Sequence, residues 1–435
     1  MSALFLFSMA TRRDPARLPL AWWIPDQACR RPMALALEHP ELRMRFGALP
    51  DLLRQRKPLL PGRRAGTRLF QALELYRTLG AGPRFRPAWA GWNEDQPVLA
   101  VSTSGTSGRP GTVLLSPANL ASSARAVNRA VGLGPGDRWL NVLPLQHIAG
   151  IAILVRCLQA GATMVLHERF DVNAVWTALR DHAITHISLV PALLARLLEH
   201  AGTARAPASL RVVLVGGGHL DEALAARALA HDWPIHVTWG MTETASAVAI
   251  RRLDASALPQ THRVGRPLAG LQVRVTDNQA RLAIWGPQVT AGRHPARVRR
   301  RSRAGVPRRW HLSPDWGTVD PHGEVWVLGR RDRIVISGGV NVPLEAVERT
   351  LLTHPAVREV WAMGLPDPVW GERVAALVVG EAEVEALGRW VRERLPAAWR
   401  PREIHRLARL PRTPLGKIDA AAARRLVSAP LDGGQ

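Results

Sequence analysis

The 435-residue chain has little cysteine and no long apolar run, and both absences narrow its class. Its 2 cysteines, Cys29 and Cys157, are too few for a disulfide framework or a cysteine-based metal site. The apolar start at residues 3–10 is far too short to cross a bilayer, and it precedes Arg12 and Arg13, the reverse of the order in a signal peptide. The hydrophobic content of 47% is ample for a buried core. We therefore expect a globular cytoplasmic protein with no transmembrane segment.

Lysine and tyrosine are nearly absent. Lysine occurs only at Lys57 and Lys417, so 56 of the 58 lysine and arginine residues are arginines. The chain has a single tyrosine, Tyr76, but 16 tryptophans. The net charge of +23 would suit a nucleic acid or an anionic membrane. The densest arginine cluster, residues 297–309, lacks interleaved aromatic residues, however, and no nucleic-acid-binding signature occurs. We expect a solvated surface loop there and no nucleic-acid partner; a basic nucleic-acid binder is an alternative that rests on charge alone.

Apolar runs of strand length alternate with helical patterns from residue 97 onward, which predicts βαβ units and a mostly parallel sheet. Beyond residue 264 the segments become short and strand-rich, and a separate αβ pattern begins near residue 330. The sequence thus predicts an α/β fold: a large N-terminal domain with mostly parallel sheets flanked by helices plus a small β-rich subdomain, and a small mobile α+β C-terminal domain. The predicted parts are a reduced or divergent N-terminal segment (1–96), the core domain (97–331) and the C-terminal domain (332–435).

Individual elements follow from the same patterns. In the first 96 residues, helical periodicity predicts helices at residues 42–55 and 67–79. The strands expected in the core are 138–144, 163–166, 186–190, 211–215 and 235–238. The helices expected there are 119–131, 149–160, 172–182 and 191–200.

One polar stretch runs TSGTSGRPGT from Thr103 to Thr112, between an apolar run at 97–101 and the helical pattern at 119–131. Its glycines permit backbone angles with positive φ, so successive N–H groups can form a nest for an anion, with the hydroxyls as further donors. A flexible Ser/Gly linker is the plainer alternative, but a linker is seldom held between a strand and a helix. We expect a phosphate-binding loop, with nucleotide contacts from Thr103, Ser104, Gly105, Thr106, Ser107 and Gly108.

Five further motifs follow this loop: LPLQHIAG at 143–150, VGGGHL at 215–220, WGMTET at 239–244, GRRDRIVISGGVN at 329–341 and LPRTPLGKID at 410–419. Together they resemble the motifs of the adenylate-forming superfamily (acyl-CoA synthetases and AMP-dependent ligases), in the same order and over residues 97–426. The chain departs from the family loop at Gly111, where the family has lysine, and at Thr112, where it has glycine; Arg109 is a candidate for the missing cation. In its short length the chain is most similar to the compact o-succinylbenzoate–CoA ligases of menaquinone biosynthesis.

The resemblance implies the nucleotide contacts. Trp239, where the family has tyrosine, offers an aromatic face for adenine, and Gly240 allows close approach. Thr242 places a hydroxyl near the phosphate, and Glu243 supplies a carboxylate to Mg²⁺, which needs few protein ligands besides the phosphates. The other implied ATP and AMP contacts are a glycine turn against adenine and an acceptor and a donor for the ribose hydroxyls: Gly217, Gly218, Asp315 and Arg330.

The resemblance also implies catalytic and thiol-binding residues. Lys417 takes the position of the catalytic lysine, where a compact ammonium offsets negative charge between the carboxylate and the α-phosphate. An arginine would not be equivalent there, because its guanidinium differs from an ammonium group in shape and hydration. The other implied catalytic residues are Thr242 and His147. His147 is expected to lie beside the substrate carboxylate. A hinge at Asp332 lets the C-terminal domain rotate, and a tunnel for coenzyme A is lined by Ser337, Gly338 and Gly339.

The implied function is that of a two-step ligase. A carboxylate attacks the α-phosphate of Mg·ATP, which gives acyl-AMP and pyrophosphate, and coenzyme A then displaces AMP to give the acyl-CoA. The implied partners are small molecules, namely the carboxylate, ATP with Mg²⁺, and coenzyme A; a homodimer is also considered. Three alternatives stay open: another aryl or fatty acid as the substrate, loading of a carrier protein instead of coenzyme A, and a nucleotide-binding pseudoenzyme.

Overall fold

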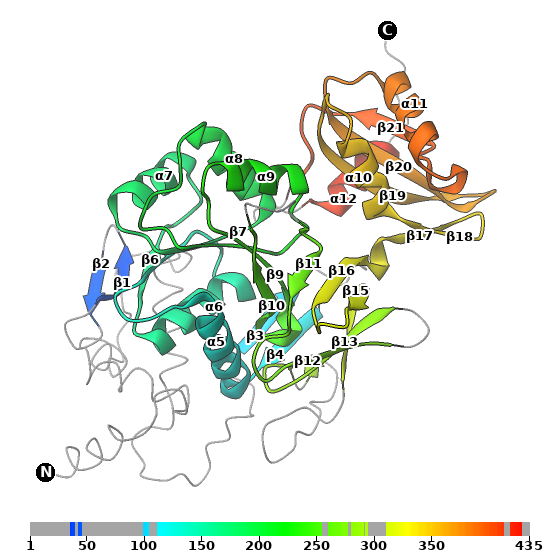
Figure 1. Cartoon of the computed structure of the whole chain (residues 1–435). Coiled ribbons are helices and arrows are strands. Elements are labelled where there is room, and N and C mark those ends of the chain that lie inside the picture. The colour runs from blue at the N-terminus through cyan, green and yellow to red at the C-terminus, as the bar shows by residue number, and fades with distance from the viewer. Residues whose placement is uncertain are drawn as a thin grey trace, which may run out of the picture.

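The computed structural model describes residues 35–39, 42–45, 99–103, 111–254, 260–276, 280–290, 292–294, 310–412 and 418–428 of the chain. Figure 1 shows a large part coloured blue to yellow, which holds three sheets, and beside it a smaller C-terminal part coloured from dark yellow to red. Both parts combine helices with sheets, so the predicted α/β class, with a large N-terminal and a small C-terminal domain, is confirmed.

The largest sheet has eight strands, in the spatial order β10 (Ser246–Arg252), β9 (Ile235–Met241), β8 (Val212–Val215), β7 (His186–Leu189), β5 (Arg138–Asn141), β6 (Thr163–Leu166), β1 (Leu35–His39) and β2 (Leu42–Arg45). Strands β9 to β1 are parallel, and the antiparallel strands β10 and β2 form the two edges. Every residue of β6, β7 and β8 is buried, as expected for parallel strands that are covered on both faces.

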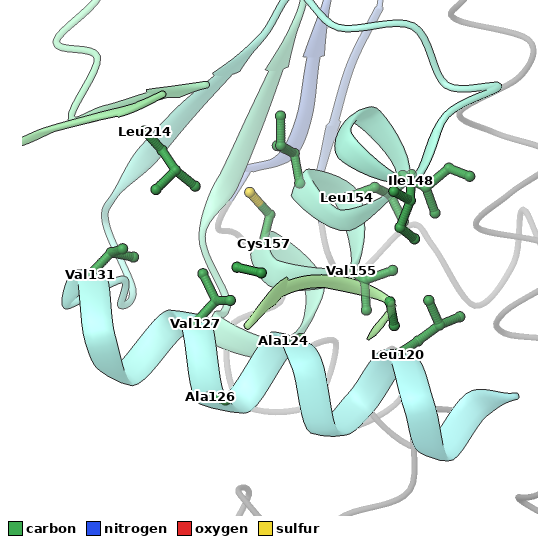
Figure 2. Close-up of a cluster of buried hydrophobic side chains, with 14 of the residues drawn as sticks. Leu120, Ala124, Ala126, Val127, Val131, Ile148, Leu154, Val155, Cys157 and Leu214 are labelled. Atoms are coloured by element: carbon green, nitrogen blue, oxygen red, sulfur yellow. The ribbon is translucent and has the colours of Figure 1, made fainter. Parts of the chain in front are cut away.

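Helices cover both faces of this sheet. On one face lie α5 (Pro117–Val131) and α6 (Ile148–Ala160), and on the other lie α7 (Val172–Asp181), α8 (Pro191–Ala201) and α9 (Glu222–Ala230). Figure 2 shows Leu120, Ala124 and Val127 of α5 on the side that faces Leu154 and Val155 of α6. These side chains of α5 recur every three to four residues, the spacing that places them on one face of a helix.

Local chemistry sets both ends of α5. Ser116 is the N-cap, and its hydroxyl accepts a hydrogen bond from the Asn119 N–H at 3.2 Å, while the Asn119 side chain accepts one from the Ser116 N–H at 3.0 Å. Pro117 stands in the first turn, where its missing N–H costs nothing. The helix ends at Gly132, which adopts the left-handed conformation. These capping residues therefore determine where α5 begins and ends.

Two smaller sheets complete the large domain. One has the order β11 (Arg263–Gly265), β16 (Val325–Arg330), β15 (His311–Val319), β13 (Arg281–Trp285) and β12 (Gln272–Val275). The other has the order β14 (Gly292–His294), β4 (Gly111–Leu115) and β3 (Leu99–Thr103). All neighbouring strands in both sheets are antiparallel, and together they form the β-rich part that the sequence predicted.

The C-terminal domain is built on one sheet with the order β18 (Val340–Pro343), β17 (Ile334–Ser337), β20 (Gly371–Gly380) and β19 (Val357–Asp367), and β21 (Glu403–Arg406) pairs with β20. Its helices are α10 (Leu344–Leu352), α11 (Val384–Arg394) and α12 (Ala420–Ser428). The mobility of this domain stays a prediction. None of the helices in the described ranges is long and apolar enough to cross a membrane.

One expectation about local structure is wrong, and one strand, β4, was not expected. The helix predicted for 42–55 does not begin at residue 42, because residues 42–45 form strand β2, in which Met44 is buried and Arg45 is exposed by the two-residue period of a strand. The rest of that helix, and the one at 67–79, lie outside the described residues. The phosphate loop also does not lead into a helix: β4 follows it and pairs with β3, and α5 begins only afterwards.

Candidate active site

Part of the predicted site lies outside the described residues. It comprises the phosphate-loop residues Ser104, Gly105, Thr106, Ser107 and Gly108, together with Arg109 and the lysine Lys417. The structure does describe the flanks of both segments: Thr103 ends β3 and pairs with Gly111 of β4, and Arg412 pairs with Ile418. The contacts assigned to the loop and to Lys417 therefore stay predictions.

Three predicted motifs gather at one edge of the large sheet. The glycine turn with Gly217 and Gly218 directly follows β8, and both glycines are exposed. His147 is half-buried and caps α6 shortly after β5. Because β5, β8 and β9 are parallel, the segments that follow them meet at the carboxyl edge of the sheet, where ligands bind in open α/β folds.

The segment after β9 is a tight reversal. β9 leads into the 3₁₀ turn η3 (Thr242–Thr244), and β10 then returns antiparallel to β9. Gly240 is required here by close approach, since a Cβ at this position would overlap the backbone carbonyl oxygen of Ser246. The Thr244 hydroxyl donates to the same Ser246 carbonyl at 2.7 Å. The predicted phosphate-side residues Thr242 and Glu243 are thus carried on a turn that is held by its own hydrogen bonds.

Trp239 and Asp315 are far apart in the chain, but a buried hydrogen bond joins them. The indole Nε1–H of Trp239 donates to Oδ2 of Asp315 at 2.7 Å, and only 6% of Trp239 and 8% of Asp315 are exposed. The Ser313 hydroxyl donates to the same oxygen at 2.8 Å. Asp315 also faces Arg330 across β15 and β16. The structure thereby brings together the predicted adenine face, ribose acceptor and ribose donor, while their nucleotide contacts stay predictions.

Arg156, on α6, is a charged residue that the motif analysis did not select. It is 2% exposed, its Nη2 donates to the Ser246 hydroxyl at 2.7 Å, and its guanidinium lies 5.2 Å from the ring centre of Trp139. Among the described residues no carboxylate pairs with it, and its Nε has no hydrogen-bond partner. Burial lowers the pKa of Arg156 to about 10. Since an uncompensated buried cation is costly, this position favours an anion.

The residue next to Arg156 is a cysteine, Cys157, which is fully buried between α6 and the sheet. Figure 2 shows its sulfur within the cluster formed by α5 and α6. Burial raises the pKa of this thiol far above its usual range. The thiol is therefore protonated and serves as an apolar packing group.

The predicted hinge and thiol-binding turn both lie at the start of the C-terminal domain. Asp332 is part of the 3₁₀ turn η4 (Arg331–Arg333), between β16 and β17. Ser337 ends β17, and Gly338 and Gly339, with φ of +56° and +78°, make the turn into β18. Figure 1 shows this hairpin projecting away from the large domain.

Trp370 is a second residue that the motif analysis missed. The Gly338 N–H donates to the Trp370 carbonyl at 2.9 Å, and a Cβ at Gly338 would lie 2.5 Å from the Trp370 ring. The guanidinium of Arg402 lies 4.7 Å from the centre of the same ring. The predicted thiol-binding turn is thus backed by an aromatic ring that remains 42% exposed.

Helix α10 contacts the large domain at two points. The Arg330 N–H donates to Glu345 Oε1 at 3.3 Å, and Arg349 Nη1 donates to His262 Nε2 at 2.7 Å. His262 in turn stacks on His219, which follows the glycine turn, with ring centres 4.1 Å apart. Burial raises the pKa of Glu345 to about 7. The position of the C-terminal domain is therefore linked to the strand that carries Arg330 and to the glycine turn.

Glu243 is the predicted magnesium ligand, and it is buried in η3. Within the described ranges, no three His, Cys, Asp or Glu side chains gather as a metal cage. Mg²⁺ commonly binds through one or two carboxylates together with nucleotide phosphates and water. A magnesium ion that arrives with ATP therefore fits this single carboxylate.

Two family models match the chain: the AMP-binding enzyme model over residues 64–292 and the AMP-binding enzyme C-terminal domain model over residues 346–417. A 2-succinylbenzoate–CoA ligase of Bacillus mycoides (strain KBAB4) is 32% identical over 346 residues, which are 77% of this chain and 71% of the relative. Two solved structures of the o-succinylbenzoate CoA synthetase of Bacillus subtilis are 26% identical. The complex with ATP and magnesium ion has a TM-score of 0.76 and covers 92% of this chain and 98% of that chain. The complex with the acyl-adenylate intermediate has a TM-score of 0.78 and covers 96% and 99%.

Fold, motif positions and comparisons together define an adenylate-forming enzyme, as the resemblance of the motifs predicted. The chain belongs to the AMP-binding enzyme family. Its two family matches fall on the large domain and on the C-terminal domain, respectively.

Proposed function

We propose that the protein is an ATP-dependent carboxylate–CoA ligase that acts through an acyl-adenylate and uses o-succinylbenzoate as its acid. Membership of the AMP-binding enzyme family supports the adenylation chemistry, and relatives of the chain are named for this acid. None of the reported relatives favours a pseudoenzyme, a carrier-protein loading enzyme or a fatty-acid substrate. A homodimer and a cytoplasmic location, both considered from the sequence, remain predictions.

In the first half-reaction, a carboxylate oxygen attacks the α-phosphorus of ATP and the bond from that phosphorus to the bridging oxygen breaks. Acyl-AMP and pyrophosphate result. Trp239, Asp315 and Arg330 would hold the adenosine part, and the phosphate loop and Lys417 would offset the negative charge that builds between the two anions. Mg²⁺ at Glu243 would supply Lewis-acid stabilisation of the phosphate oxygens.

In the second half-reaction, the thiol of coenzyme A loses its proton and its sulfur attacks the acyl carbon. The bond from that carbon to the phosphate oxygen breaks, AMP leaves and the thioester forms. The turn with Gly338 and Gly339 would line the thiol path once the C-terminal domain has rotated about Asp332. The division into a core domain (97–331) and a C-terminal domain (332–435) is part of this proposal.

The buried position of Arg156 is the observation that supports o-succinylbenzoate as the acid. o-Succinylbenzoate has two carboxylates, so one is activated while the other stays an anion. Arg156 lies on α6, the helix that begins within the segment assigned to the acyl group, and its guanidinium donates to the hydroxyl of Ser246, two residues after the nucleotide motif. The ring carboxylate of the substrate would supply the anionic partner that Arg156 lacks among the described residues. A simple fatty or benzoic acid would leave this cation uncompensated.

ATP–pyrophosphate exchange tests the proposal with two acids, o-succinylbenzoate and 4-oxo-4-phenylbutanoate, which lacks the ring carboxylate. We expect the wild type to prefer the dicarboxylate by roughly 10- to 100-fold, as for a hydrogen bond to a charged group. Arg156→Met should abolish that preference. Arg196→Met is the matched control, because the Arg196 guanidinium also stacks on an aromatic ring, that of Phe170, but on α8. Exchange without preference would contradict only the choice of acid, and ATP binding without exchange for any acid would contradict the ligase.

A further inference from the structure

The indole of Trp239 is not explained by adenine stacking alone. The Trp239 side chain is packed among core side chains of the large domain, and 6% of it is exposed. Its specific contact is made by the ring edge, where Nε1–H donates to Asp315 Oδ2 at 2.7 Å. A buried hydrogen bond to a carboxylate is among the stronger interactions of a protein. The residue at the aromatic position of this motif therefore acts on Asp315.

The two carboxylate oxygens of Asp315 have different surroundings. Oδ2 accepts hydrogen bonds from Trp239 Nε1 and from the Ser313 hydroxyl, at 2.7 Å and 2.8 Å. Ser313 is itself fixed, because its hydroxyl accepts the Asp315 N–H at 2.9 Å. No described residue donates to Oδ1. With two donors on one oxygen, the carboxylate is held in one orientation and the lone pairs of Oδ1 stay available for a ligand.

We propose that Trp239 is a positioning residue for ribose recognition: its indole N–H holds the Asp315 carboxylate so that Oδ1 accepts the ribose hydroxyls. A cis-diol offers two O–H donors, and one carboxylate oxygen can accept both. Arg330 faces Asp315 in register and would meet the same ribose. This inference rests on the proposed function in one respect, that adenosine occupies this site.

A purely structural tie is the competing explanation. The hydrogen bond joins β9 of the eight-stranded sheet to β15 of the five-stranded sheet, so it also connects two parts of the large domain. The two explanations differ in what they predict for the nucleotide. A structural tie affects every nucleotide equally, whereas a positioned carboxylate affects only nucleotides that carry ribose hydroxyls.

Calorimetric titration of AMP and of 2′,3′-dideoxy-AMP separates them. Trp239→Phe keeps a six-membered aromatic ring and removes the donor. We expect its affinity for AMP to fall about five- to tenfold, with little change for the dideoxy nucleotide. Ser313→Ala removes the second donor and should change the ratio in the same direction. Trp233→Phe is the matched control, because the Trp233 indole is also buried and its N–H has no partner among the described residues.

Combination with Asp315→Asn tests whether Trp239 acts through the carboxylate. If it does, Trp239→Phe causes no further loss of AMP affinity in the Asp315→Asn protein. Equal losses for both nucleotides in Trp239→Phe, or a wild type that does not distinguish them, would overturn the proposal. If Trp239→Phe fails to fold, Ser313→Ala decides by the same ratio. A wild type that prefers AMP but forms no acyl-adenylate would uphold the positioning role and reject the proposed function.

Discussion

The nucleotide side of the large domain and the thiol side of the C-terminal domain are built in opposite ways. On the nucleotide side, Trp239 and Asp315 are buried and joined by a hydrogen bond within the protein itself. On the thiol side, the turn of Gly338 and Gly339 is exposed and Trp370 beside it is half-covered. The first surface is preorganised by its own packing, whereas the second would be completed only after the proposed rotation of the C-terminal domain. Damage to the first should therefore weaken nucleotide binding, and damage to the second should slow only the thioester step.

Lys417→Ala should give the largest effect on a half-reaction rate. It is also the sharpest test of the comparison between the two sides, because Lys417 lies in the C-terminal domain but is assigned to the adenylation step. Loss of the ammonium should slow acyl-adenylate formation by roughly 10²–10³-fold, the usual result of removing one electrostatic contact to a transition state. Thioester formation from supplied acyl-AMP should be spared. Separate assays of the two half-reactions measure this, and equal loss of both would contradict the assigned role.

Asp315→Ala tests the nucleotide side directly. Removal of a charged acceptor for the ribose should weaken ATP and AMP binding by about 10- to 100-fold, since a hydrogen bond to a charged group contributes roughly 1.5–3 kcal/mol. Calorimetry of AMP binding measures it. Asp320→Ala is a suitable control, because Asp320 lies just beyond the same strand and receives hydrogen bonds within its own turn. Unchanged AMP affinity in Asp315→Ala would remove this residue from the site.

Gly338→Ala and Gly339→Ala are a matched pair on the thiol side. Both positions have positive φ, so alanine costs about 1–2 kcal/mol of local strain at either one. Only at Gly338 would the new Cβ meet the Trp370 ring; at Gly339 nothing lies within 4 Å. We expect thioester formation to be about fivefold slower in Gly338→Ala than in Gly339→Ala, as for loss of one aromatic contact. ATP–pyrophosphate exchange should stay normal in both, and an equal defect in exchange would break the comparison.

Arg349→Gln should give the smallest effect, because exposed polar contacts contribute at most about 1 kcal/mol. The Val327 carbonyl takes the Nδ1–H of His262 at 2.9 Å, so Nε2 accepts Arg349 only while His262 is neutral. Burial and the Arg349 charge lower the pKa of His262, and the hydrogen bond to the Val327 carbonyl and the charge of Glu222 oppose them. The contact is therefore intact above the ordinary histidine pKa of about 6.5 and is lost as the pH falls below it.

The readout for Arg349→Gln is the ratio of the two half-reaction rates as a function of pH. This ratio should change as the pH falls below about 6.5 in the wild type, because the pKa of His262 is lowered, and it should be nearly constant in the variant. Arg358→Gln is the control, since Arg358 is an exposed arginine of the same domain whose ion pair is with Glu381. A ratio that changes with pH equally in all three proteins would exclude this contact as the cause.

The sequence alone predicted the parallel core well. The elements that it predicted and the elements that it missed differ for physical reasons. Strand β6 matches its predicted range of 163–166, because a continuous apolar run between turns has few other structures. Strand β4 was missed because its first residue, Gly111, reads as part of the polar loop. The four residues of β2 are too few to distinguish a two-residue period from a helical one.

The site shows the same division. Motif order and residue types selected positions such as His147 and Gly217, which the structure places at the carboxyl edge of the sheet, since parallel strands bring their ends together. They did not predict Arg156, because a single charge inside an apolar helical run belongs to no motif. They also could not predict the hydrogen bond from Trp239 to Asp315, because contacts between distant strands depend on how two sheets pack and leave no local pattern.

The buried Cys157 has a practical consequence for redox chemistry. Disulfide exchange requires a reachable thiolate, and this sulfur is neither reachable nor ionised. An enzyme that handles a free thiol as its substrate therefore cannot form a mixed disulfide at Cys157 while it is folded. With Cys29 replaced, a cysteine introduced at exposed Val340 would be the group that thiol-reactive dyes modify. A dye at that position would test whether the hairpin of the C-terminal domain approaches the large domain.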